Sequence, residues 1–100
     1  MIQKLNSMHI EWSEEKNNKL KKERGFGFED VVTAIGLGRM LDNKRHPSPE
    51  YSHQMIAVVE IEGYAVIVPY VMKENGNWFL KTAYPSRKAT KYYLGDDCDD

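Results

Sequence analysis

The sequence predicts an α+β protein in which helices pack on an antiparallel sheet. Three apolar runs, Gln54–Glu62, Tyr64–Lys73 and Trp78–Tyr84, hold most of the β-branched and aromatic residues, which favour strands. Glu62-Gly63 and Asn75-Gly76 separate these runs, and both dipeptides favour tight hairpin turns. We therefore expect the three runs to form an antiparallel meander, with helices on either side of it in the sequence.

The first helix is predicted from Ser13 to Arg24. Ser13 is a suitable N-cap, and Glu14 and Glu15 in the first turn complement the helix dipole. Gly25 suits the left-handed residue that follows a helix. This helix has few apolar residues, so we expect a thin buried stripe and a wide polar face.

The second helix is predicted from Phe28 to Leu37. Phe28, Val31, Val32 and Ile35 recur at helical spacing, which indicates one buried face. Short strands are expected at Met8–Trp12, before the first helix, and at Arg39–Asn43, after the second.

A long loop is expected at Lys44–Ser52, because Pro47 and Pro49 prevent regular structure there. Pro69 lies inside the second strand of the meander and cannot donate a ladder hydrogen bond, so we expect a bulge or a gap in pairing beside it. The apolar residues of that strand occupy both parities, which suits a strand covered on both faces.

In the third strand, alternation predicts that Trp78, Leu80, Thr82 and Tyr84 share one face. A short last helix is predicted over Arg87–Leu94, with Ser86 as its N-cap.

One hundred residues make one domain, which we expect over residues 1–95. Asp96, Asp97, Asp99 and Asp100 form an acidic tail that we expect to be disordered. Fourteen basic and eleven acidic residues remain in the body. No apolar run is long enough to cross a membrane, and the N-terminus lacks the pattern of a signal peptide. The single Cys98 cannot form an internal disulfide, so the sequence favours a cytoplasmic protein.

The densest cations follow the meander, in the segment Lys81–Lys91. Arg87 follows a strand end and is held by Pro85 and the capping Ser86, in a defined position where a guanidinium can bind a phosphate with two hydrogen bonds. The alternative is a basic helix whose cations simply favour its C-terminal end. The cations of the first helix, Lys22 among them, likewise suit either a solvated face or a phosphate-contacting one.

His46 and His53 are the side chains near the sheet whose ordinary titration range is close to neutrality. His46 follows Arg45 on the stiff loop and is the better candidate for proton transfer, although either ring can be an ordinary solvent-exposed residue. The His and Cys residues lack the spacing of a zinc site, and there is no phosphate-binding glycine loop, so we expect neither a metal nor a cofactor.

The chain resembles the BrnT-like toxins of type II toxin–antitoxin systems, in the RelE/ParE-like group. The resemblance covers about residues 9–94 and is carried by short motifs. These are Glu11-Trp12 and Lys16, the helix stop at Gly25, Phe28-Glu29-Asp30, Arg45-His46 with Glu50, and the ending Lys81-Thr82-Ala83-Tyr84-Pro85-Ser86-Arg87-Lys88-Ala89-Thr90.

The resemblance implies a RelE-like fold, with two N-terminal helices packed on a twisted antiparallel sheet of about four strands and a short C-terminal helix. It implies a metal-independent endoribonuclease that cleaves mRNA, on the ribosome or free, and so inhibits translation. Arg87 would clamp the phosphate, Lys81 and Lys88 would add positive field, and His46 or Tyr84 would transfer protons, with Tyr92 in reserve. The catalytic candidates are therefore Arg87, His46, Lys81 and Tyr84, and the RNA-binding candidates are Lys88, Lys91, Arg45 and Lys22.

Two other functions remain open at this point. One is a non-enzymatic toxin that acts on a protein target such as gyrase, and the other is an interaction domain whose basic helix docks an acidic partner. The resemblance also implies a cognate antitoxin as partner, and operator DNA only through the antitoxin complex.

Overall fold

The protein is described here from a computed structural model that covers residues 2–5, 8–51 and 53–95. The expected disordered tail, residues 96–100, and the end of the predicted loop, Ser52, lie outside these described residues. No helix in the described part of the chain has the length and apolar composition needed to cross a membrane.

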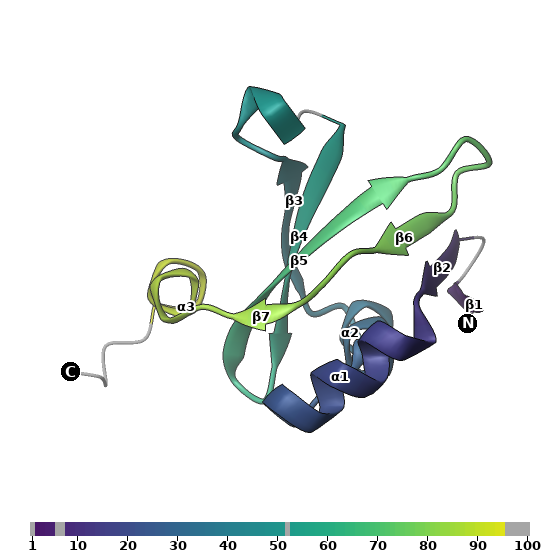
Figure 1. The fold of residues 1–100 in the computed structure, drawn as a ribbon. Helices are drawn as coiled ribbons and strands as arrows, with labels where there is room; N and C mark the ends of the chain where they lie inside the picture. The colour runs from purple at the N-terminus through teal and green to yellow at the C-terminus, as the bar shows by residue number, and fades with distance from the viewer. Residues whose placement is uncertain (1, 6–7, 52, 96–100) are drawn as a thin grey trace.

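Three α-helices and a mixed β-sheet make up the described chain (Figure 1). In chain order the elements are β1 (Ile2–Leu5), β2 (Met8–Trp12), α1 (Glu14–Arg24), α2 (Phe28–Gly36), β3 (Met40–Arg45), a 3-10 turn (Pro49–Tyr51), β4 (Gln54–Ile61), β5 (Tyr64–Met72), β6 (Trp78–Leu80), β7 (Tyr84–Pro85) and α3 (Arg87–Leu94). The strand order is β1-β2-β6-β5-β4-β3, and β7 pairs separately with β5.

The predicted RelE-like sheet of about four antiparallel strands is wrong. β2 runs parallel to β6, with Ile10 opposite Trp78 and Trp12 opposite Leu80, so the sheet is mixed. β1 adds a further strand, antiparallel to β2, that was not predicted because its four residues give too short a pattern. A parallel partner far along the chain leaves no local sequence signal, so this pairing is decided only by the tertiary fold.

The predicted loop at Lys44–Ser52 is also shorter than expected. β3 continues through Lys44 to Arg45, opposite Ile56 and Met55 of β4, and Pro49–Tyr51 forms a 3-10 turn. The strand persists into this segment because the backbone of β4 pairs with it, and Pro47 then ends it.

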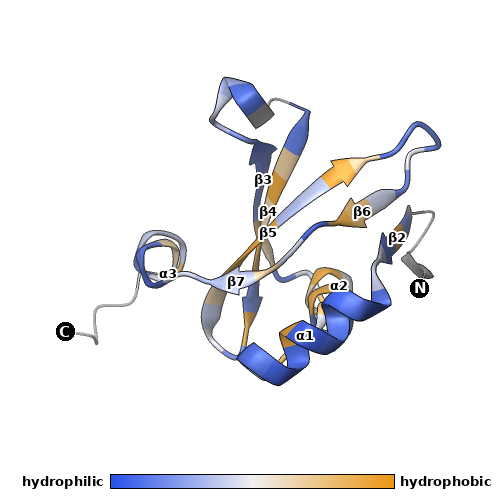
Figure 2. Cartoon of the chain, viewed as in Figure 1, coloured by the Kyte–Doolittle hydropathy of each residue, from blue (hydrophilic) through white to orange (hydrophobic). Residues whose placement is uncertain are grey.

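The main core lies between one face of the sheet and the helices α1 and α2. Figure 2 shows α1 as mostly hydrophilic and α2 as mostly hydrophobic. α1 buries Leu20, whereas α2 buries Phe28, Val31, Val32 and Ala34. The strands add buried residues from β2, β4, β5 and β6, namely Ile10, Trp12, Ala57, Val59, Val66, Val68, Tyr70, Trp78 and Leu80.

The helix ends follow the predicted signals. The Ser13 hydroxyl accepts a hydrogen bond from the Lys16 amide at 3.3 Å, and Gly25 adopts a left-handed conformation with φ of 80°. Ser86 is the N-cap of α3, and its hydroxyl accepts a hydrogen bond from the Ala89 amide at 3.0 Å. These local signals were therefore sufficient to locate the ends of α1 and the start of α3.

The pairing of β5 is interrupted beside Pro69, as its missing N–H predicts. β6 pairs with β5 as far as Tyr70 opposite Leu80, and the chain resumes pairing in β7 with Tyr84 opposite Ile67. Three residues on the returning chain, 81–83, therefore oppose two on β5, 68–69. The extra residue reverses the alternation, so the prediction that Tyr84 shares a face with Trp78 and Leu80 is wrong.

α3 packs on the other face of the sheet (Figure 1). Ala89 of α3 joins Val58 of β4 and Ala65 of β5 in a second, smaller core, with Ile67 and Tyr93 packed against it. The predicted two-sided cover of β5 is thereby confirmed over residues 65–68, because Ala65 and Ile67 belong to the second core and Val66 and Val68 to the main core.

Candidate functional site

An open groove lies between α3 and the sheet, with a volume of about 720 Å³. We call it the α3 groove. Its lining residues come from β3, β4, β5, β7, α3 and the loop after β3: Asp42, Lys44, Pro47, Ile56, Val58, Ile67, Tyr84, Ser86, Lys88, Ala89, Lys91, Tyr92 and Tyr93.

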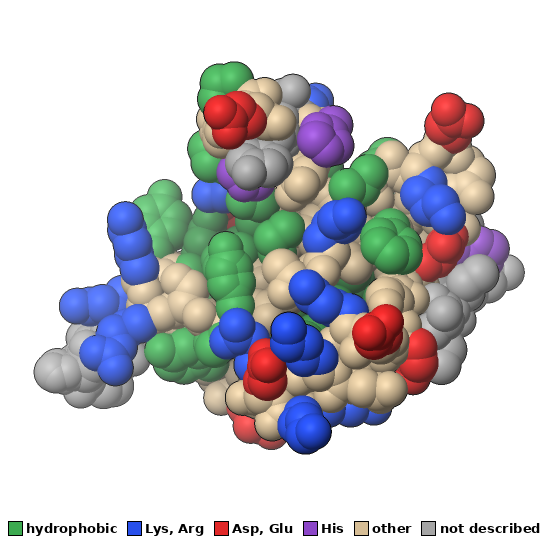
Figure 3. All heavy atoms as spheres, in the orientation of Figure 1, with side chains coloured by type: hydrophobic (Ala, Val, Ile, Leu, Met, Phe, Trp, Pro, Cys, Tyr) green, Lys and Arg blue, Asp and Glu red, His purple; other side chains and the backbone are tan. Residues whose placement is uncertain are grey.

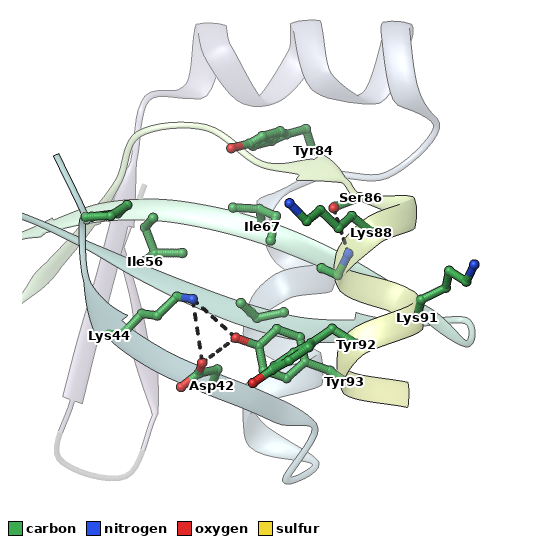
Figure 4. A pocket seen from close by; sticks show the side chains of 13 residues that line it. Asp42, Lys44, Ile56, Ile67, Tyr84, Ser86, Lys88, Lys91, Tyr92 and Tyr93 are labelled. Atoms are coloured by element: carbon green, nitrogen blue, oxygen red, sulfur yellow. Dashed lines mark hydrogen bonds and ion pairs between the residues drawn. The ribbon is translucent and has the colours of Figure 1, made fainter. Parts of the chain in front are cut away.

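The floor of the α3 groove is apolar and its margins carry cations and phenol rings. Ile56 and Ile67 form part of the floor, and Lys44 and Tyr84 approach from opposite sides (Figure 4). Lys88 points across the groove, whereas the end of the Lys91 side chain is directed away from it (Figure 4). The groove can therefore offer positive charge above an apolar surface.

A polar cluster fixes the end of α3 to β3. The Tyr93 hydroxyl donates a hydrogen bond to Asp42 Oδ2, and Lys44 Nζ lies 3.4 Å from the Tyr93 hydroxyl and 4.0 Å from Asp42 Oδ2 (Figure 4). The hydrogen bond from Tyr93 lowers the pKa of Asp42 most, and the hydrogen bond from the Asn43 amide lowers it further. The same bond raises the pKa of Tyr93. At neutral pH this cluster therefore holds an ionised carboxylate, a protonated phenol and a lysine.

Tyr92 and Tyr84 are the exposed aromatic side chains of the α3 groove. Tyr92 is 79% exposed and its ring meets that of Tyr93 edge-on, with centroids 4.8 Å apart. Tyr84 is 38% exposed. Exposed rings of this kind are suited to stacking against flat ligand groups.

Three of the predicted site residues line the α3 groove: Tyr84, Lys88 and Lys91. Five others are not among its lining residues: Arg87, His46, Lys81, Arg45 and Lys22. Arg87 is the exposed first residue of α3, and its neighbour Lys88 takes the position inside the groove.

The remaining predicted residues lie on other parts of the fold. His46 immediately precedes Pro47 of the groove, and its Nδ1 accepts a hydrogen bond from the Ser48 amide at 3.1 Å. Arg45 lies opposite Met55 in the β3–β4 pair. Lys22 lies on α1, which packs on the opposite face of the sheet from α3, so it cannot share a site with Lys88.

Three residues of the site were not predicted from the sequence: Asp42, Lys44 and Tyr93. Asp42 and Lys44 were assigned to a short strand and a loop, although their spacing of two puts both on one face of a strand. This alternation was the one signal in the sequence that could have placed Asp42 and Lys44 side by side. The approach of Tyr93 to Asp42 joins positions 51 residues apart and had no signal in the sequence.

Among the described residues, no three His, Cys, Asp or Glu side chains lie together in a way that would hold a metal ion. A scan against protein-family models finds no matching family, and a search of curated proteins finds no significant match.

Proposed function

We propose that this protein is a toxin of a type II toxin–antitoxin system that binds single-stranded mRNA in the α3 groove and cleaves it, which stops translation. The observation that supports RNA binding is the combination of Lys44, Lys88, Tyr84 and Tyr92 around one apolar floor. The short motifs that resemble BrnT-like toxins, above all the segment Lys81–Thr90, support the toxin assignment.

The chemistry of the α3 groove suits a single strand better than a duplex. Proteins that bind single strands combine lysines that follow the phosphates with aromatic rings on which bases stack. The Lys88 side chain makes no ion pair with a described residue, so its charge is available to a phosphate. A duplex would keep its bases stacked inside and leave the exposed rings of Tyr84 and Tyr92 without partners.

RNA cleavage in this groove would proceed by attack of a 2′-oxygen on the neighbouring phosphorus, with departure of the 5′-oxygen. A base accepts the 2′-hydroxyl proton, and an acid protonates the leaving oxygen. Lys88 takes the charge-stabilising role first assigned to Arg87, because it lines the groove. The proposed proton-transfer residues are Tyr84, which lines the groove, and His46, which does not line it but immediately precedes its lining residue Pro47. His46 Nδ1 accepts a hydrogen bond from the Ser48 amide, which assigns the proton of a neutral ring to Nε2.

The test is inducible expression in a bacterium, comparing the wild type with Lys88→Ala. We expect the wild type to arrest growth with loss of intact mRNA. Lys88→Ala should relieve the arrest, because loss of one charge-stabilising group slows cleavage by roughly 10²-fold. Lys19→Ala is the matched control, since it removes the same charge from the exposed face of α1.

Three other results would change the proposal. If Arg87→Ala relieves the arrest and Lys88→Ala does not, the assignment of the phosphate contact to the α3 groove is wrong. Arrest with intact mRNA would support a toxin that acts on a protein. Absence of arrest in the wild type would support a plain interaction domain.

The protein-directed alternative has its own supporting observation. The apolar floor of the α3 groove and the exposed ring of Tyr92 also suit a hydrophobic segment of another protein. As a toxin of this class the protein would act in the cytoplasm, be neutralised by a cognate antitoxin and meet operator DNA only within that complex.

A further inference from the structure

The sheet face that carries α3 continues beyond the helix. Along β5, Ala65 and Ile67 of this face belong to the core that α3 covers. Because side chains alternate along a strand, Pro69 and Val71 lie on the same face. Both are partly exposed, so α3 leaves this end of the face open.

Phe79 and Lys81 stand on this open part of the face. Phe79 lies opposite Val71 in the β5–β6 pair and is partly exposed. The Lys81 amide donates a hydrogen bond to the Pro69 carbonyl at 2.9 Å, which fixes its backbone beside β5. Lys81 Nζ lies 5.7 Å from the centroid of the Phe79 ring. A cation and an aromatic ring therefore occur together for a second time on the same face as the α3 groove.

This pair is separated from the α3 groove by a distance that a short RNA can cover. Tyr84 of the groove lies opposite Ile67, and Phe79 lies opposite Val71, four residues further along β5. Four strand residues extend about 13 Å. Stacked nucleotides advance about 3.4 Å each, so no more than about four nucleotides separate the two positions.

We infer that Phe79 and Lys81 form a second nucleotide subsite, in which the RNA that leaves the α3 groove stacks a base on Phe79 and places a phosphate against Lys81. This inference rests on the proposed RNA-binding function of the α3 groove and names the path of its substrate. Lys81 moves from the Phe79 ring to the phosphate, and the ring face that it leaves receives the base.

The charges around this subsite are compatible with a polyanion. Glu11 neighbours Phe79 through the parallel β2–β6 pair. Its carboxylate is already satisfied, because Lys73 Nζ lies 2.9 Å from Oε1 and Asn77 donates to Oε2 at 2.8 Å. Lys81 makes no ion pair with a described residue, so its charge faces solvent on this surface. Lysine and arginine side chains lie beside hydrophobic ones on the face between α3 and β6 (Figure 3).

The test is an NMR titration with two 2′-O-methyl oligouridines, an octamer and the dinucleotide. Methylation blocks the attacking oxygen, so neither is cleaved. The dinucleotide has one phosphate and fills one subsite at a time, whereas the octamer spans both. Amide signals of α3 and β6 report the two subsites separately. The variants are Lys81→Ala, Phe79→Leu and Lys88→Ala, with Lys19→Ala as the charge-matched control.

We expect Lys81→Ala and Phe79→Leu each to weaken octamer binding by roughly fivefold or more, because a base–aromatic stack and a phosphate contact are lost. Both should leave dinucleotide binding at the α3 amides within about a factor of two of the wild type. Phe79→Leu removes the ring without changing charge, and Lys81→Ala covers the case in which Phe79→Leu unfolds the sheet.

Two results would overturn this inference in different ways. If Lys88→Ala weakens both ligands while Lys81→Ala binds the octamer like Lys19→Ala, the second subsite does not exist and the α3 groove remains the RNA site. If the wild type binds neither ligand, or Lys88→Ala changes nothing, the proposed function fails and the inference fails with it.

Discussion

At the scale of single residues, the corner between α1 and α2 depends on Gly27 and Asn17. Asn17 is fully buried, and its Oδ1 accepts from the Phe28 amide at 2.7 Å while its Nδ2 donates to Glu29 at 2.9 Å. A Cβ atom at Gly27 would lie 2.6 Å from Asn17 Oδ1 and 2.7 Å from Glu29 Oε1. The absence of a side chain at Gly27 therefore permits the bond that joins the two helices.

Gly27→Ala should lower the free energy of unfolding by about 1–3 kcal/mol, because the new methyl group displaces a buried amide that cannot move without losing two hydrogen bonds. Urea denaturation measures this loss. Gly36→Ala is the control, since it replaces an exposed glycine at the end of α2 with a better helix former and should be neutral or stabilising. Equal stability of Gly27→Ala and the wild type would show that the side chains around Gly27 can make room for a methyl group without loss of stability.

At the scale of elements, α3 is attached to the sheet through a buried threonine. Thr90 Oγ1 accepts from the Ala65 amide at 2.9 Å and donates to the Ser86 carbonyl at 2.7 Å. The Ser86 amide in turn donates to the Ala65 carbonyl at 3.0 Å. These bonds hold the first turn of α3, which supplies Lys88 and Ala89 to the lining of the α3 groove, against β5.

Thr90→Val keeps the shape of the side chain but leaves the buried Ala65 amide without its acceptor. We expect a loss of about 1–3 kcal/mol in the free energy of unfolding. Amide hydrogen exchange at Ala65 should become faster at the same time, which distinguishes a local effect from general destabilisation. Thr33→Val on the exposed face of α2 is the matched control and should change the stability by less than about 0.5 kcal/mol. Unchanged exchange at Ala65 would contradict the role given to Thr90.

At the scale of the whole molecule, carboxylates tie segments that are distant in the chain. Glu11 links β2 to Lys73 and Asn77 near the β5–β6 turn, and Asp42 links β3 to Tyr93 of α3. The hydrogen bonds from Asn77 and Lys73 lower the pKa of Glu11, as the bond from Tyr93 lowers that of Asp42. Lowered values mean that the folded state favours the ionised forms.

Stability should therefore fall in acid. A carboxylate with a lowered pKa stabilises the fold above its ordinary value, here 4.5 for glutamate and 3.8 for aspartate, and this contribution is lost as the pH falls through the lowered pKa. Urea midpoints measured between about pH 5 and about pH 3 should decrease in the wild type and decrease less in Glu11→Gln and Asp42→Asn. Glu74→Gln, in the exposed β5–β6 turn, should follow the wild type. If the urea midpoints of all four proteins fall equally with pH, the lowered pKa values of Glu11 and Asp42 do not contribute to stability.

The sequence by itself determined the features that depend on near neighbours. The helix ends follow from Ser13, Gly25 and Ser86. The buried face of α2 follows from the periodicity of Phe28, Val31 and Val32. The break in the pairing of β5 follows from the missing backbone N–H of Pro69. Each follows from hydrogen bonds or sterics within a few residues.

Only the tertiary structure decided the composition of the site. The one-residue excess beside Pro69 reversed the alternation, so Tyr84 lines the α3 groove instead of sharing a face with Trp78 and Leu80 as predicted. The same fold brought Tyr93 to Asp42 and separated Lys22 from α3. The alternation of side chains along one strand can be predicted from the sequence. The register of that strand against its partner, and the parallel pairing of β2 with β6, depend on how distant segments of the chain pack. The two faces of the sheet become different only when helices cover them, and this cover is a property of the tertiary structure.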